Sequence, residues 1–196
     1  MKAASNTFKD MPVLQFKTQK AWATWLDKNH ARSSGVWVRI SKKGSAIKSI
    51  SYSEGVEAAL CYGWIDGQKE RCDESSWLQK FTPRGARSIW SKINREKAEE
   101  LIKSGRMKRA GMEAIATARQ NGRWEGAYDS PSGSSVPSDF QAALDKNAAA
   151  KAFFSTINRA NRYAILFRLQ TARKAETRAK RIQQFIGMLE KKETMH

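Results

Sequence analysis

The sequence predicts an α+β fold, with a small antiparallel sheet of about three strands packed with helices and an all-helical, basic C-terminal part behind it. Two observations lead to this fold class. Up to about residue 125, segments with apolar residues at helical spacing alternate with segments of period two, whereas beyond residue 138 only helical spacing occurs. The 196 residues are 40% apolar, which is enough for a core and excludes a chain disordered throughout.

The first half of the chain contains signals for two helices and a strand. Residues 18–29 follow the N-cap residue Thr18 with apolar side chains at i, i+3 and i+4, which predicts a helix. Residues 35–41 alternate in the manner of a half-buried strand. Residues 51–54 match a capping box, a hydroxyl followed three residues later by Glu, and predict a helix that ends at Gly63.

Two more strands and two more helices are predicted before residue 125. Trp64 leads into a second strand, and residues 76–82 form a third that a short hairpin joins to it. Asn94 is suited to cap the next helix, which Gly105 stops. A further helix is expected over residues 108–121, and Gly122 stops that one.

A change of composition divides the chain. Residues 126–138 are rich in Ser, Gly and Pro and are predicted to form a linker. A core domain over residues 10–125 precedes it, and a helical subdomain over residues 139–192 follows. In the last helix of that subdomain Arg178 lies in line with the apolar stripe, where a packing or pairing role competes with a surface role.

Basic residues outnumber acidic ones by 36 to 19, which gives a net charge of +17. The excess is strongest near the C-terminus, where residues 151–196 carry a net +8. Such a charge favours anionic partners: an anionic small molecule, an acidic partner surface or nucleic acid. A solvated helix face is the ordinary explanation of a basic helix, and both interpretations stay open at this point.

The sequence also predicts the compartment. No apolar run of about 7–15 residues occurs at the N-terminus, and none approaches the roughly 18–20 residues of a membrane span, so we expect a cytoplasmic protein without a span. Cys61 and Cys72 are then expected to be free thiols. With only His30 and the terminal His196 to join them, they do not suggest a zinc site, and we expect neither metal nor cofactor.

Several motifs together resemble a known family, the bacteriocin-protection, YdeI/OmpD-associated (OmdA-like) proteins. They are residues 52–67 (YSEGVEAALCYGWIDG), 81–84 (FTPR), 88–94 (SIWSKIN), 105–107 (GRM), 122–124 (GRW), 172–174 (ARK) and 176–182 (ETRAKRI). The resemblance spans roughly residues 12–192. It implies a role in tolerance of bacteriocins and antimicrobial peptides, a form of stress resistance, and an association with an outer-membrane porin, but no reaction.

Polar and aromatic residues concentrate between the second strand and the following helix, and they form our candidate ligand-binding set. An arginine fork can hold a carboxylate or phosphate, indoles supply flat walls, and a helix start offers free N–H groups. The competing interpretation is that the tryptophans fill the core and Asp66 pairs with Arg71 or Arg84. The set comprises Trp64, Asp66, Arg71, Arg84, Ser88, Trp90, Ser91, Asn94 and Arg106.

Two alternative functions are kept beside this one. The helices on either side of Gly105 have helix-turn-helix proportions, and a basic tail follows, so non-specific nucleic-acid binding is one alternative. Its candidate residues are Lys108, Arg109, Arg173, Lys174, Arg178, Lys180 and Arg181. The other alternative is an enzyme of unknown reaction with Asp66 as acid or base, because this segment contains no histidine for that role.

Overall fold

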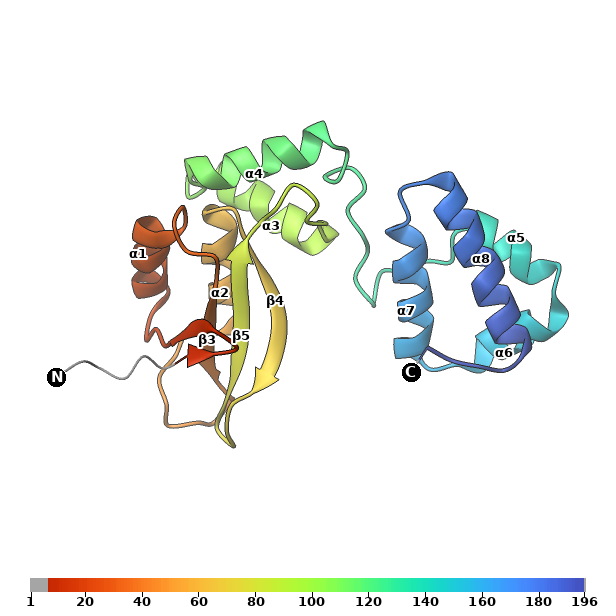
Figure 1. The fold of residues 1–196 in the computed structure, drawn as a ribbon, viewed down its shortest axis with the longest axis horizontal. Helices are drawn as coiled ribbons and strands as arrows, with labels where there is room; N and C mark the ends of the chain where they lie inside the picture. Colours follow the sequence, from red (N-terminus) through yellow and green to blue (C-terminus); the bar gives the residue numbers. More distant parts are fainter. Residues whose placement is uncertain (1–6, 196) are drawn as a thin grey trace. The chain divides into compact units, whose positions relative to one another are not determined.

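The computed structural model describes residues 7–195, and its chain divides into two compact units (Figure 1). The first unit holds the residues up to Ser88 together with Asn94–Gly122. The second holds Ile89–Ile93 and the chain from Arg123 onward. His196 and residues 1–6, which entered the expectations on metal ligands and on export, lie outside the described residues.

The first unit is a mixed α+β layer structure, as predicted, but its sheet has five strands rather than three. The strands are β1 (Thr7–Phe8), β2 (Met11–Leu14), β3 (Val36–Ser41), β4 (Trp64–Arg71) and β5 (Ser76–Pro83), in the spatial order β1-β2-β3-β5-β4. Beside them lie α1 (Gln19–Asn29), α2 (Tyr52–Cys61), α4 (Arg109–Gln120) and the part of α3 (Lys92–Lys103) from Asn94 onward.

The expectation of a purely antiparallel sheet was wrong at its N-terminal edge. Strand β2 pairs in parallel with β3, with Val13 opposite Trp37. The short β1 and β2 escaped prediction because their turn lacks the usual glycine: Lys9 and Asp10 adopt φ of 47° and 60° themselves. Two strands of two and four residues also offer too few positions for a period-two pattern.

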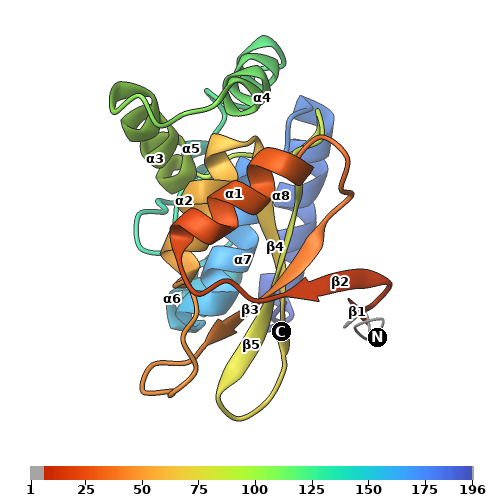
Figure 2. The ribbon, with the colours of Figure 1, turned by 90° about the vertical axis from the view of Figure 1, so that its left-hand side faces the viewer.

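The other strands follow the expected order. Strand β5 is antiparallel to β3 and to β4, and the β4 register shifts between Asp66 and Lys69. Helices α1 and α2 lie on the same side of the sheet (Figure 2). Between them and the sheet Trp22 is fully buried, and it contacts Trp64 and Phe81 at ring-centroid distances of 6.3 and 5.5 Å.

The predicted helix caps are confirmed at α1 and α2. The Thr18 side chain accepts a hydrogen bond from the Ala21 N–H, and Ser51 forms a capping box with Glu54. Gly63 ends α2 at φ +69°, as predicted. Its missing Cβ also lets α4 approach, because a Cβ there would lie only 2.7 Å from the Ala110 carbonyl oxygen. Helix α3 starts at Lys92, two residues before the cap that the sequence favoured.

The second unit is helical, as predicted for the C-terminal part. Its helices are α5 (Ser138–Asp145), α6 (Ala148–Thr156), α7 (Arg159–Gln170) and α8 (Ala175–Glu190). They enclose their own apolar core, in which Phe140, Ile165, Phe185 and Leu189 are almost fully buried. Across residues 7–195, no helix combines the length and apolar character that a membrane crossing requires.

Candidate functional site

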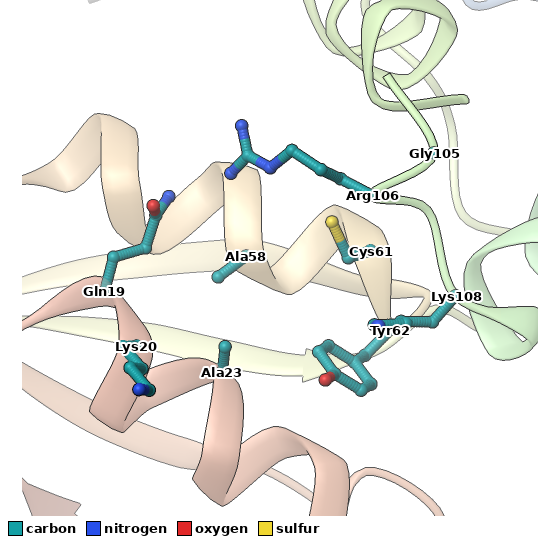
Figure 3. A pocket seen from close by; sticks show the side chains of 9 residues that line it. All are labelled: Gln19, Lys20, Ala23, Ala58, Cys61, Tyr62, Gly105, Arg106 and Lys108. Atoms are coloured by element: carbon teal, nitrogen blue, oxygen red, sulfur yellow. The ribbon is translucent and has the colours of Figure 1, made fainter. Parts of the chain in front are cut away.

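A cationic hollow opens in the first unit between α1, α2 and the turn that joins α3 to α4, and we call it the Arg106 hollow (Figure 3). Its volume is about 370 Å³. Figure 3 shows the Arg106 side chain extending along α2 on the side to which the Cys61 sulfur points, whereas the Lys20 amine is turned away. The lining residues are Gln19, Lys20, Ala23, Ala58, Cys61, Tyr62, Gly105, Arg106 and Lys108.

Local sequence explains how the α3–α4 turn presents its cations. Gly105 takes φ +69° after α3, so the chain reverses without strain. The backbone N–H groups of Arg106 and Met107 then donate to the Leu101 carbonyl, and that of Lys108 donates to the Cys61 carbonyl at 3.1 Å. The turn is therefore fastened to the ends of both α3 and α2, and its side chains start from a fixed backbone.

A carboxylate beside the hollow holds Arg106 in place. Arg106 Nη1 lies 2.7 Å from Glu57 Oε1, and Gln19 Nε2 donates to Glu57 Oε2 at 2.9 Å. Burial alone would raise the pKa of Glu57, but the hydrogen bonds from Gln19 and Arg106 outweigh it, and the pKa lies below its ordinary value. Glu57 is thus ionised at neutral pH and orients the guanidinium.

The floor of the hollow is weakly polar. Burial raises the pKa of the Cys61 thiol, so Cys61 is a neutral wall rather than a reactive thiolate. Burial, reinforced by the nearby Asp27 carboxylate, raises the pKa of Tyr62 to about 12. The Tyr62 hydroxyl therefore stays protonated and can donate a hydrogen bond; it donates to Asp27 at 3.3 Å.

A second hollow adjoins the first and shares Tyr62 and Lys108 with it; we call it the His30 hollow. It measures about 550 Å³ and is lined by Asp27, His30, Tyr62, Lys108, Arg109, Ala110 and Glu113. His30 Nδ1 lies 2.9 Å from the Leu26 carbonyl oxygen, which can only accept, so Nδ1 carries a proton and donates this hydrogen bond. The two hollows together place several cations and one imidazole around the Tyr62 phenol.

The first three residues of the predicted ligand-binding set do not gather at one place. Trp64 is buried among α1 aromatic rings and its Nε1 donates to the His30 carbonyl at 3.2 Å, so it is a core residue. Asp66 accepts a 2.6 Å hydrogen bond from the Tyr52 hydroxyl rather than pairing with the arginines considered. Arg71 is exposed at the far end of β4, about five strand residues or 16 Å from Asp66.

The turn after β5 and the start of α3 hold three more of the predicted residues. Arg84 is half-buried, and its backbone N–H donates to the Gly63 carbonyl at 2.9 Å. Ser88 closes a turn, because its Oγ accepts from the Gly85 N–H at 3.1 Å. Asn94 lies half-buried in the first turns of α3. Only Arg106 of the predicted set lines the Arg106 hollow.

Trp90 and Ser91 belong to the second unit, which the sequence did not indicate. Trp90 is buried and its ring stands edge-on to Trp124 with centroids 4.8 Å apart. Its carbonyl accepts the Tyr128 N–H at 2.9 Å, and Ser91 forms a parallel bridge with Tyr128. The segment thus adds a short strand-like contact to the second unit, where Trp90 is buried against Trp124.

The basic tail predicted for nucleic acid largely serves the helices themselves. Arg178 binds the Asp139 carboxylate with Nε at 2.5 Å and Nη2 at 2.8 Å, and its Nη1 donates to the Leu169 carbonyl. Arg181 donates to the Arg168 carbonyl. These two arginines add side-chain donors to carbonyl groups in the last turn of α7, where cations are favoured. Of the two roles considered for Arg178, the structure therefore shows pairing rather than a surface role.

The other residues of that alternative are more exposed. Lys180 pairs with Glu176 one turn earlier in α8, and Arg109 pairs with Glu113 at 2.8 Å in α4. Lys108 lines both hollows. Arg173 and Lys174 lie exposed just before α8.

The Asp139–Arg178 pair makes a testable contribution to acid stability. Arg178 hydrogen bonds lower the pKa of Asp139 below its ordinary value. Because the folded pKa is depressed, the stabilisation is present above the unfolded pKa and is lost as pH falls through the folded one. We expect the wild type to lose more stability than Asp139→Asn in urea unfolding between about pH 7 and about pH 2. Equal losses in both proteins would contradict the pairing.

Apart from Arg106, and Lys108 in the nucleic-acid alternative, the sequence analysis assigned no binding role to the residues that line the Arg106 hollow. A signal existed, because Glu57 and Cys61 are four residues apart and so share one side of the predicted helix. The contributions of Gln19 and Lys20 carried no such signal, since only packing brings α1 beside α2.

Within residues 7–195, no group of three or more His, Cys, Asp or Glu side chains is arranged to hold a metal ion.

Fold and hollows together define a basic α+β protein of two units with a cationic hollow in the first. The chain belongs to the family described as Domain of unknown function (DUF8412), whose model matches residues 14–114, more than half of the sequence. Residues 134–192 match the family model described as Bacteriocin-protection, YdeI or OmpD-Associated (OmdA). No match is found among curated proteins, and none among solved structures.

The family matches confirm the predicted OmdA resemblance and locate it. It holds over the helical part, which includes the motif at residues 176–182 with Arg178 and Arg181. The motifs at 52–67, 81–84, 88–94 and 105–107 instead lie within the DUF8412 match. The first unit, with the Arg106 hollow, is therefore covered by a family whose description assigns no function.

Proposed function

We propose that this protein is a binding protein of the bacteriocin-protection type, and that its Arg106 hollow takes a small anionic ligand. The OmdA match over residues 134–192 supports the first part. The observation that carries the second is the convergence of Arg106 and Lys108, from one rigid turn, on a hollow with a neutral floor. A volume of about 370 Å³ suits a small molecule rather than a protein surface.

Arg106 retains binding capacity although it is paired. Its contact with Glu57 uses Nη1, and a guanidinium has five N–H donors in a planar fork, so the rest of the fork can bind a carboxylate or a phosphate. The Arg106 side chain is 49% exposed, which leaves it open to a solute. Glu57 orients the fork and also repels an anion, so we expect moderate affinity rather than tight binding.

The compartment proposed from sequence fits this function. Cys61 and Cys72 are free, as expected in a reducing compartment. We therefore propose that the protein acts in the cytoplasm on a metabolite or on an acidic group of a partner, in a role related to stress resistance.

Removing the Arg106 charge should weaken anion binding without unfolding the protein. Pyrophosphate and citrate are suitable probes, titrated separately by calorimetry at low ionic strength. Arg106→Gln should raise the dissociation constant at least about tenfold, since a charge-assisted bidentate contact is lost. Glutamine keeps a polar side chain at this half-exposed position, so the local fold should be preserved. The thermal midpoint should change little.

Lys103→Gln is the matched control, because Lys103 is an exposed cation at the end of α3 outside the hollow. Its dissociation constants should stay within about twofold of the wild type. The proposal fails if neither probe binds at about 10 mM, or if both variants weaken binding equally, since diffuse surface charge would then explain the affinity.

A further inference from the structure

An apolar groove runs along α7 in the second unit, and neither the proposed function nor the family motifs account for it. It measures about 910 Å³ and is formed within the second unit by Ile93, the loop around Pro131, and one side of α7. The α7 side chains in it include Ala160, Tyr163 and Phe167. We call it the α7 groove.

Helix α7 is apolar on two sides, although packing against the core of the second unit requires only one apolar side. Ile165, Leu166 and Leu169 are buried in the core of the second unit. Ala160 is exposed and Tyr163 is half-buried on the groove side, where positions i, i+3 and i+7 repeat an apolar stripe. Ile93 adds a side chain that is 47% exposed at the groove. Apolar side chains grouped in an open groove indicate a surface that a partner covers.

The loop wall of the groove is held rigidly, and Asp129 is its anchor. The Tyr163 hydroxyl donates to the Asp129 carbonyl at 3.0 Å, and Gln170 makes two hydrogen bonds to Asp129, at 2.9 and 3.0 Å. Lys92 completes the set with an ion pair to the Asp129 carboxylate at 2.5 Å. A groove with fixed walls loses little conformational entropy on binding, so this arrangement favours a docking site.

Size and shape favour a helical occupant. The small side chains of Ala160 and Ala164 alternate with the rings of Tyr163 and Phe167, which produces a notch of the kind that receives a ridge of a second helix. The residues from Arg159 to Arg168 span about 13–14 Å of α7, enough for about two and a half turns of an occupant helix.

Charge identifies the chemistry of that helix. Arg159 and Arg168 both line the groove and stand nine residues apart on α7. No carboxylate side chain belongs to the groove lining. We therefore propose that the α7 groove docks an acidic amphipathic helix of a partner protein, with apolar residues at i, i+3/i+4 and i+7 against Tyr163 and Phe167 and acidic residues toward Arg159 and Arg168.

The test uses the full chain and a synthetic peptide of 16 residues, an alanine-based helix with leucines at i, i+3, i+4 and i+7 and glutamates near both ends. Fluorescence anisotropy of the labelled peptide should show saturable binding with a dissociation constant of about 10–100 μM. Ala160→Phe, which fills the groove at an exposed position, should weaken binding at least about tenfold. A peptide with lysine in place of glutamate should not bind.

Ala149→Phe is the matched control, since Ala149 is exposed on α6 and outside the groove; it should bind the peptide as the wild type does. The proposal is overturned if the glutamate peptide does not bind, if Ala160→Phe leaves its binding unchanged, or if the lysine peptide binds equally well. If the peptide does not bind, two further results would show a different occupant and overturn the proposal. One is self-association of the protein in light scattering that Ala160→Phe abolishes, and the other is binding to phosphatidylglycerol vesicles that the same change abolishes.

Discussion

Replacing Gly111 by alanine is expected to lower the free energy of unfolding by about 2–3 kcal/mol, although alanine is the better helix former. A Cβ on Gly111 would lie 2.5 Å from the Cys61 carbonyl oxygen and 2.8 Å from that of Leu60. Both contacts are with backbone, so α4 must move away from the end of α2. Urea unfolding followed by tryptophan fluorescence measures the loss.

Gly187→Ala is the control for this result. Gly187 lies inside α8, and a Cβ there meets nothing within 4 Å. The same substitution should therefore stabilise the protein by about 0.5–1 kcal/mol through helix propensity. If Gly111→Ala were neutral or stabilising as well, the close approach of α2 and α4 would be disproved.

The position of Gly111 matters for the proposed site. Helix α4 begins one residue after Lys108, and the Lys108 N–H is bound to the Cys61 carbonyl that the new methyl group would approach. We therefore expect Gly111→Ala to weaken pyrophosphate binding as well as stability, whereas Gly187→Ala should leave binding unchanged.

Replacing Arg178 by alanine is expected to cost about 2 kcal/mol, with the partial exposure of Asp139 already discounted. The change removes two hydrogen bonds to Asp139 and one to the Leu169 carbonyl, which then keeps only backbone N–H donors such as that of Ala172. The substitution thus removes the side chain that links three segments: the start of α5, the end of α7 and the first turns of α8. The measurement is urea unfolding at about pH 7, where Asp139 is ionised.

Lys180→Ala is the matched control on the same helix. Lys180 pairs with Glu176 on an exposed face, where such a pair contributes only about 0.3–0.5 kcal/mol. A small, equal effect of both substitutions would show that Arg178 acts as a surface charge, which is what the nucleic-acid alternative requires. Double-stranded DNA titrated at several salt concentrations then decides that alternative directly, because phosphate contacts give a linear loss of log affinity with log salt.

Local patterns were sufficient to predict most elements of the first unit. The capping box at Ser51, the cap at Thr18 and the stop at Gly63 depend on interactions within about four residues, which a single sequence contains. Strands β1 and β2 depended on pairing with β3, and the Lys9–Asp10 turn uses positive φ without glycine, so no local pattern marked them.

The candidate site was less predictable, because it depends on which segments pack together. The sequence drew attention to Arg106 through the run after Gly105, and the structure places that residue in a hollow. It could not show that Trp64 fills the core, that Asp66 meets Tyr52, or that Trp90 belongs to the second unit. A polar or aromatic residue in a loop looks the same in sequence whether it faces a ligand or a neighbouring helix.

The sequence alone determined the basic charge, the α+β class and the helical C-terminal part, because composition and short-range periodicity encode them, and its motifs carried the OmdA resemblance. Only the tertiary structure decided what the arginines do. Arg106 keeps donors available beside a hollow, whereas Arg178 and Arg181 use theirs on a carboxylate and on helix carbonyls. The physical reason is that a guanidinium binds whichever acceptors folding brings within about 3 Å, and those acceptors lie far away in the sequence.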